Sequence, residues 1–167
     1  MAGSVILAID PGLRGGLCFM SDDGIIAEPM PLNQEGDDLD LHEIAKMLGD
    51  WKHDLRFVLV EEMRAIPVFG NFQIVGVRKL WRGIGSIHGI CVALNIEIKF
   101  VAPHVWMKVM HEGQPGGKKG KETKIKSRAA FEALFPGVNV TKPGCRVPDE
   151  GMIEATLIAE YGRRMNL

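Results

Sequence analysis

The sequence predicts an α/β fold, in which helices cover both faces of one mixed sheet. Three observations lead to this prediction. Short apolar runs alternate with longer segments of helical periodicity along the 167 residues. The first three runs are separated only by tight turns, as in hairpins, whereas helical segments separate the later ones. The run at 57–60 is wholly apolar, as in a central strand that is covered on both faces.

Five segments have the character of strands. The first ends at Asp10-Pro11-Gly12, because proline lacks a backbone donor and glycine permits positive φ. The turn Ser21-Asp22-Asp23-Gly24 joins the second strand to the third. The fifth segment alternates apolar and charged residues, which is typical of an edge strand. The expected strands are 5–9, 17–20, 25–27, 57–61 and 96–101.

Helical spacing of apolar residues fills much of the remaining chain. Leu41, Ile44 and Leu48 recur at such a spacing. The long segment 74–94 contains several glycines, each of which costs roughly 0.5–1 kcal/mol in a helix interior. Two interpretations stay open for it, a glycine-tolerant core helix and a helix that meets a second subunit. The expected helices are 39–48, 74–94, 103–110, 121–134 and 149–164.

The composition is typical of one globular domain, and we expect residues 1–167 to form it. The chain is 46% hydrophobic and 25% charged. No apolar run approaches the ~20 residues that a membrane span needs. The first residues also lack the charged region of a signal peptide, so we expect no membrane association and a cytoplasmic location. Three scattered cysteines without a CxxC pair predict neither a disulfide framework nor a zinc site.

Acidic residues stand at the ends of apolar runs, where soluble proteins rarely place them. Asp10 ends the first strand and Glu61 the fourth, and Asp149 and Glu154 open the last helix. A carboxylate at the mouth of a buried strand is unfavourable unless a positive charge meets it. Several of them, from distant parts of the chain, predict a divalent-metal site with oxygen ligands. Glu62 is interpreted as a solvated neighbour, because alternation directs it to the other face.

Basic residues gather in one part of the sequence. Residues 108–146 contain nine basic and three acidic residues, a net charge of +6, so the rest of the chain carries −7. This asymmetry predicts a polyanion-binding surface beside the acidic site, with a solvated loop as the alternative. The residues expected to contact such a polyanion are Lys118, Lys119, Lys121, Lys124, Lys126 and Arg128.

Several motifs, in their order and spacing, resemble RuvC-type Holliday-junction resolvases, in particular the phage and organellar branch. The first motifs are Asp10-Pro11-Gly12 with Gly15-Gly16, and then Val60-Glu61-Glu62-Met63. The segment 94–108, Lys126-Ser127-Arg128 with the stretch 134–137, and the segment 153–162 continue the pattern. The resemblance covers nearly the whole chain, from Val5 to Arg164.

The resemblance implies a ribonuclease H-like fold, a homodimer, and an endonuclease of bacterial or phage-infected cells that nicks four-way DNA junctions symmetrically. It implies two Mg²⁺ per active site, with Mn²⁺ as a substitute, an activated water, and no small-molecule cofactor. Asp10, Glu61, Asp149 and Glu154 match the catalytic metal ligands. The loop after Glu61 would reach the junction centre. Its expected DNA-contacting residues are Arg64, Phe69, Phe72 and Arg78, and the two phenylalanines are interpreted either as a wedge between bases or as core.

Some alternatives stay open at this point. Asp149 and Glu154 are five residues apart, a rotation of about 500° on a helix, so they lie on different faces. Glu150 and Glu154 share a face, and Glu150 is therefore an alternative third ligand. Asp149 can still turn toward the site if it is the N-cap. The alternative functions are a related metal nuclease that acts on flaps or other branched DNA, and a non-catalytic DNA-binding module of the same fold.

Overall fold

The computed structural model describes residues 3–62, 71–116 and 120–167, with the side chains of the second stretch from residue 75 onward. Five strands form one sheet in the order β3-β2-β1-β4-β5. Strands β1, β2 and β3 pair antiparallel as successive hairpins, whereas β1, β4 and β5 run parallel. The strands are β1 (Val5–Asp10), β2 (Gly16–Ser21), β3 (Gly24–Pro29), β4 (Leu55–Glu61) and β5 (Ile98–Val101). The mixed five-stranded sheet expected from the sequence is confirmed.

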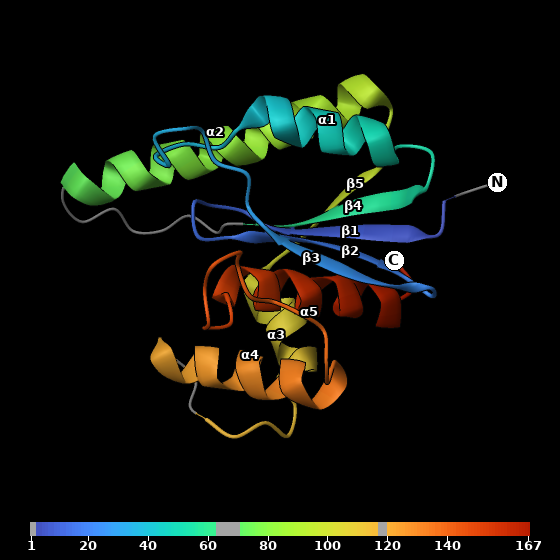
Figure 1. Cartoon of the computed structure of the whole chain (residues 1–167), viewed down its shortest axis with the longest axis vertical. Coiled ribbons are helices and arrows are strands. Elements are labelled where there is room, and N and C mark those ends of the chain that lie inside the picture. The colour runs from blue at the N-terminus through green and yellow to red at the C-terminus, as the bar shows by residue number, and fades with distance from the viewer. Residues whose placement is uncertain (1–2, 63–70, 117–119) are drawn as a thin grey trace.

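Helices form a layer on each face of the sheet (Figure 1). One layer contains α1 (Leu41–Trp51) and α2 (Asn71–Leu94), and the other contains α3 (Pro103–Met110), α4 (Lys121–Leu134) and α5 (Glu150–Arg164). In the second layer α5 lies against the sheet, and α3 and α4 pack on α5. No helix in the described ranges has the length and apolar character to cross a membrane.

Strand alternation divides the hydrophobic core into two halves. The side that faces α5 receives Ile6, Ala8, Phe57 and Leu59, and the side that faces α1 and α2 receives Leu7, Ile9, Val58 and Val60. Because side chains alternate between faces, Asp10 and Glu61 continue the first series. The sheet therefore directs both carboxylates toward the α5 layer.

Helix α5 is buried on almost every side, since it lies between the sheet and the outer helices. Eleven of its fifteen residues are buried. Glycine allows its first turn to approach the β1–β2 turn closely, because a Cβ atom on Gly151 would lie 2.3 Å from the carbonyl oxygen of Arg14. Gly15 and Gly151 also form a β-bridge. These contacts fix the start of α5 beside the end of β1.

The three cysteines are unpaired and differ in their surroundings. Cys18 and Cys91 are buried, and burial raises the pKa of their thiols to about 12 and about 11. Cys145 is exposed, in the loop that precedes α5. The absence of a disulfide framework agrees with the expectation from their spacing.

Candidate active site

Two carboxylates meet at one edge of the sheet. Strands β1 and β4 are parallel neighbours in which Ile9 pairs with Val60, so Asp10 and Glu61 follow at the same level. The carboxyl ends of parallel strands meet at the same edge of a sheet. Figure 1 shows that α4 and α5 begin at this same end of the molecule. Residues from four elements therefore converge there.

A third carboxylate, Glu154, comes from α5. It is the only residue between Gly151 and Gly162 that is not fully buried. Its negative charge raises the pKa of both Asp10 and Glu61, so it lies near both groups. Three acids that are far apart in the sequence therefore lie within electrostatic range of one another.

The proton affinities of these acids are unusual. Burial, followed by the charges of Glu154 and Glu61, raises the pKa of Asp10 well above its ordinary value. Burial, followed by the charge of Glu154, raises the pKa of Glu61 to about 7. Burial also raises the pKa of Glu154. Like charges that share a buried site disfavour ionisation unless a cation is close, which is typical of functional sites.

Lys124 of α4 brings positive charge to this cluster. Its ammonium group counteracts the rise in the pKa of both Asp10 and Glu154. The sequence placed Lys124 among the DNA-contacting lysines and gave no sign that it would face the acids. A single ammonium cannot balance three carboxylates, so the edge remains acidic when all of them are ionised.

The two other candidate acids are held by partners of their own. Asp149 is the N-cap of α5 and accepts a hydrogen bond from the backbone N–H of Met152 at 3.0 Å. Its carboxylate also forms an ion pair with Lys142, at 2.9 Å from the ammonium nitrogen. Glu150 pairs with Arg128, whose Nε lies 2.6 Å from its carboxylate. Both lie within electrostatic range of the cluster, because the charge of Asp149 contributes to the raised pKa of Asp10 and that of Glu150 to the raised pKa of Glu154.

Three polar side chains of α3, α4 and the turn after α3 lie behind the carboxylates. The Ser127 hydroxyl lowers the pKa of Glu154 through a hydrogen bond and lies 3.0 Å from Nε2 of His111. The indole N–H of Trp106 is buried and lowers the pKa of Glu61. Among the described residues, no acceptor atom lies at hydrogen-bonding distance and angle from this N–H. The rings of Trp106 and His111 meet edge to face. Sequence reasoning missed these residues, and no local pattern marks them.

The side chains of the cluster do not form a complete set of metal ligands in this structure. Within residues 3–62, 71–116 and 120–167, no three His, Cys, Asp or Glu side chains are arranged so as to hold a metal ion as they stand. The assignment of the four acids as metal ligands therefore stays a prediction.

The expected DNA-contacting residues fall into two groups. Lys121, Lys124, Lys126 and Arg128 lie on α4, which begins at the acidic edge, and Arg78 is exposed on α2. Arg64, Phe69, Lys118, Lys119 and the side chain of Phe72 lie outside the described residues. The prediction of a phenylalanine wedge consequently stays untested.

Comparisons with known proteins place the fold. No family model matches the sequence, and no curated protein matches it. Among solved structures, Thermus thermophilus RuvC in complex with a Holliday junction substrate matches with a TM-score of 0.57 and 14% identity, over 97% of this chain and 96% of that chain. The fold is RuvC-like.

Two further solved structures show the same RuvC-like fold. A second Thermus thermophilus RuvC structure has a TM-score of 0.52 and 15% identity, over 97% of this chain and 96% of that chain. The yeast mitochondrial Holliday junction resolvase Ydc2 has a TM-score of 0.50 and 14% identity, over 98% of this chain and 78% of that chain. At such low identity the RuvC-like fold is shared, and the chemistry has to be argued from the site itself.

Proposed function

We propose that residues 1–167 form a single nuclease domain that resolves four-way DNA junctions by paired symmetric nicks. One observation carries the proposal: carboxylates from β1, β4 and α5 share a sheet edge at which the lysine-rich helix α4 begins. The RuvC-like fold supports it, because one of the matching structures holds a Holliday junction substrate. An acidic cluster beside a basic helix suits a polyanion that is cut with the help of cations.

The donor set fits divalent cations. Carboxylate oxygens are the ligands that Mg²⁺ prefers, and burial together with repulsion among the acids raises the pKa values of Asp10 and Glu61, which a bound cation would oppose. We assign two Mg²⁺, or Mn²⁺ in its place, to Asp10, Glu61, Asp149 and Glu154, which would hold the ions through their carboxylate oxygens. When bound, such ions supply an activated water and neutralise charge on the reacting phosphate.

The remaining residues of the site bind the DNA backbone or act on the carboxylates. Lys124 faces the acids and is placed to attract the phosphate that approaches them. Lys121 and Lys126 extend the positive charge along α4 and hold the flanking backbone. The Ser127 hydroxyl and the Trp106 indole N–H lower the pKa values of Glu154 and Glu61, which favours the ionised, metal-binding forms. In this assignment water is the nucleophile, and no side chain forms a covalent intermediate.

Paired nicks require two sites, and we assign a homodimer through the outer face of α2. Val75, Trp81 and Val92 are exposed on this helix. Gly85 and Gly89 have open space around the position of a Cβ atom, which allows a second backbone to approach.

Analytical ultracentrifugation should show a dimer. Val92→Asp should shift the protein to monomer, whereas Val147→Asp, in the loop before α5, should leave the dimer intact. A wild-type monomer at micromolar concentration would contradict this assignment.

The central test separates binding from cleavage. Asp10→Asn should abolish cleavage of a labelled four-way junction in magnesium, because a metal ligand is lost. It should leave junction affinity within about threefold, because the basic surface is intact. Asp50→Asn, on the exposed side of α1, is the matched control and should cleave normally. Cleavage by Asp10→Asn at the wild-type rate would overturn the site.

A flap and a plain duplex run in parallel distinguish the proposed activity from its alternatives. Nicks on opposite arms of the junction support resolution. Preferential cutting of the flap would instead indicate a related branched-DNA nuclease, and binding without cleavage in any metal would indicate a non-catalytic module.

A further inference from the structure

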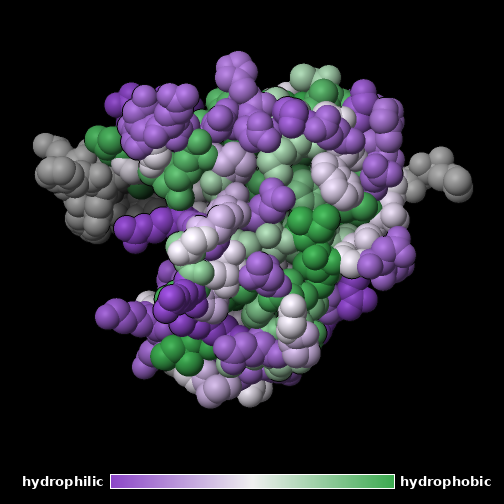
Figure 2. All heavy atoms as spheres, viewed as in Figure 1, coloured by the Kyte–Doolittle hydropathy of each residue, from purple (hydrophilic) through white to green (hydrophobic). Residues whose placement is uncertain are grey.

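A groove lies at the end of the sheet away from the acidic edge. It has a volume of about 480 Å³ and is lined by the start of β1, the β2–β3 turn and the end of α1. Its floor is apolar, because Phe19 stacks on Trp51 with ring centroids 4.7 Å apart. Ile26 of β3 borders the groove and is 47% exposed. Figure 2 shows hydrophobic residues at the surface where β3 crosses the front of the molecule, below the hydrophilic band of α1.

The groove runs along an edge of the sheet. β3 is the last strand in the sheet order, so its outer side has no strand partner in the described chain. Ser21 pairs with Gly24 across the two-residue turn, and Ile26 and Glu28 therefore occupy the hydrogen-bonded positions opposite β2. The backbone N–H and C=O groups of Ile25 and Ala27 point away from β2. An extended chain could pair with these groups.

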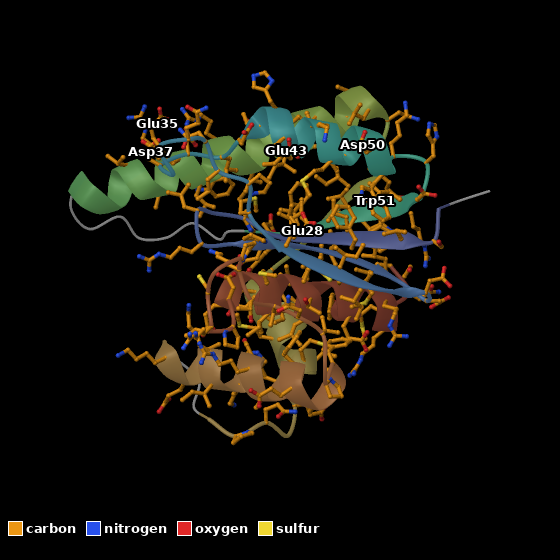
Figure 3. All side chains as sticks on the ribbon, in the orientation of Figure 1. Glu28, Glu35, Asp37, Glu43, Asp50 and Trp51 are labelled. Carbon is orange, nitrogen blue, oxygen red and sulfur yellow. The ribbon has the colours of Figure 1, made fainter. Side chains whose placement is uncertain are left out.

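The surroundings of the groove are strongly acidic. Residues 22–54 contain ten acidic residues and two basic ones, Lys46 and Lys52. Of the ten, Asp37 and Asp38 pair with Lys79 and Arg82 of α2, away from the groove. Asp23 and Asp54 line the groove itself. Lys46 is shared between two carboxylates of α1, at 3.9 Å from Glu43 and 3.8 Å from Asp50. Figure 3 shows that Glu28, Glu43 and Asp50 lie on the same side of the molecule as Trp51.

This surface serves no step of the proposed nuclease. It lies at the opposite end of β1 from Asp10, and its negative charge repels a DNA backbone. An apolar groove, a free strand edge and an acidic rim together favour a ligand that is extended, apolar on one side and positively charged.

We propose that the groove and the free edge of β3 bind a basic, extended segment of a partner protein as an added strand. The segment pairs with the backbone of Ile25 and Ala27. Alternate side chains enter the groove beside Ile26 and Trp51, and its lysine or arginine residues meet Asp23, Asp54 and Glu28. Pro29 has no backbone N–H, so the pairing is limited to the first part of β3.

Synthetic peptides test the chemistry of the ligand. A labelled ten-residue peptide that alternates lysine and leucine should bind the full chain in fluorescence anisotropy, more weakly at high salt. A glutamate–leucine peptide and a lysine–glycine peptide of equal length should not bind. Equal binding of the lysine–glycine peptide would show charge attraction alone and would overturn the role of the groove.

Amide hydrogen exchange followed by NMR tests the geometry. The peptide should protect the amides of Ile25 and Ala27, whose N–H groups point outward, and leave those of Ile26 and Glu28 unchanged, because they already pair with β2. Protection elsewhere would overturn the proposal. Protection of Ile25 and Ala27 that grows with protein concentration, without peptide, would instead assign the edge to a second copy of this chain.

Substitutions complete the test. Ile26→Asp should weaken peptide binding about tenfold or more, because it places a charge in the apolar contact. Leu134→Asp, on α4 and 38% exposed, is the matched control and should bind the peptide as wild type does. Asp23→Lys with Asp54→Lys should also weaken binding without removing an apolar residue, because both acids line the groove. Unaltered affinity in both groove variants would reject this surface as the binding site, and junction cleavage, measured alongside, should stay at the wild-type level.

Discussion

Glu61 ends the most deeply buried part of the sheet, and its position is unfavourable when it is ionised. Its side chain is buried, and its pKa rises from an ordinary 4.5 to about 7. Desolvation is the main cause, followed by the charge of Glu154. The residue is therefore expected to serve function at the expense of stability, since metal binding needs the ionised form.

Glu61→Gln should stabilise the metal-free protein at alkaline pH. A pKa that is higher in the folded than in the unfolded state means that unfolding free energy falls as pH rises from 4.5 to about 7. Glutamine removes this loss, so the variant should gain up to about 3 kcal/mol over wild type at pH 8 and little at pH 4. Chemical denaturation at both pH values measures the difference.

The control for this experiment is Glu132→Gln, because Glu132 is an exposed glutamate of α4. It should change stability by less than about 0.5 kcal/mol at either pH. An equal effect of Glu61→Gln at pH 4 and pH 8 would contradict an origin in ionisation. Added magnesium should reduce the difference in unfolding free energy between Glu61→Gln and wild type at pH 8, because it stabilises the wild type.

For individual residues, the sequence predicts where some carboxylates of the candidate site lie, but it does not predict their ion-pair partners. Asp10 and Glu61 were identifiable because each directly follows an apolar strand, and parallel pairing then brings them together. The ion pairs of Asp149 with Lys142 and of Glu150 with Arg128 were not predictable. They depend on how α4 and the loop before α5 pack, and no periodicity in the sequence encodes that packing.

Among the elements, α5 does most to assemble the site. It carries Glu154 and is capped by Asp149, and it is held between the sheet and α4. Its approach to the β1–β2 turn depends on residues without side chains, because a Cβ atom on Gly151 would lie 2.3 Å from the carbonyl oxygen of Arg14. Displacement of α5 would move Glu154 away from Asp10.

Gly151→Ala should therefore destabilise the fold by about 1–3 kcal/mol, as overpacking does. It should also weaken Mg²⁺ binding measured by calorimetry, because the start of α5 shifts. Gly49→Ala is the matched control, since Gly49 lies inside α1 with open space around its Cβ position. That change should stabilise the protein by roughly 0.5–1 kcal/mol. Equal stability of the two variants would show that close packing at Gly151 is unimportant.

Element boundaries show where sequence reasoning succeeds and where local chemistry overrides it. The helices expected at 103–110 and 121–134 are confirmed. The helix expected at 39–48 instead begins at Leu41 and runs to Trp51, because Asp40 caps it through the N–H groups of His42 and Glu43. The strand expected at 96–101 begins at Ile98, because the N–H of Ile96 bonds the carbonyl of Cys91 in the turn that ends α2.

On the scale of the whole molecule, charge is separated between two regions. Basic residues lie on α4 beside the acidic cluster, and acidic residues dominate the segment 22–54 around α1 and β3. Residues 108–146 carry a net charge of +6, and the fold places the part of it that lies on α4 beside the acidic cluster. A charged ligand would therefore be oriented before contact.

Changing Lys121, Lys124 and Lys126 together to alanine should weaken binding to all four-way junctions, measured without magnesium. The plot of log affinity against log salt concentration should become shallower by about 2–3, close to one for each lost phosphate contact. Changing Lys46 and Lys52 of the α1 region to alanine should leave both affinity and slope unaltered. An unchanged slope in the α4 variant would show that this helix does not touch the DNA backbone.

The contrast between the three cysteines has a practical consequence. Cys18 and Cys91 are shielded and remain protonated, whereas Cys145 is open to reagents in the loop that also carries Lys142. A maleimide dye or a nitroxide spin label should therefore attach at one position without any engineered change. Because that loop leads into the cap of α5, such a probe would report junction engagement from a few residues away.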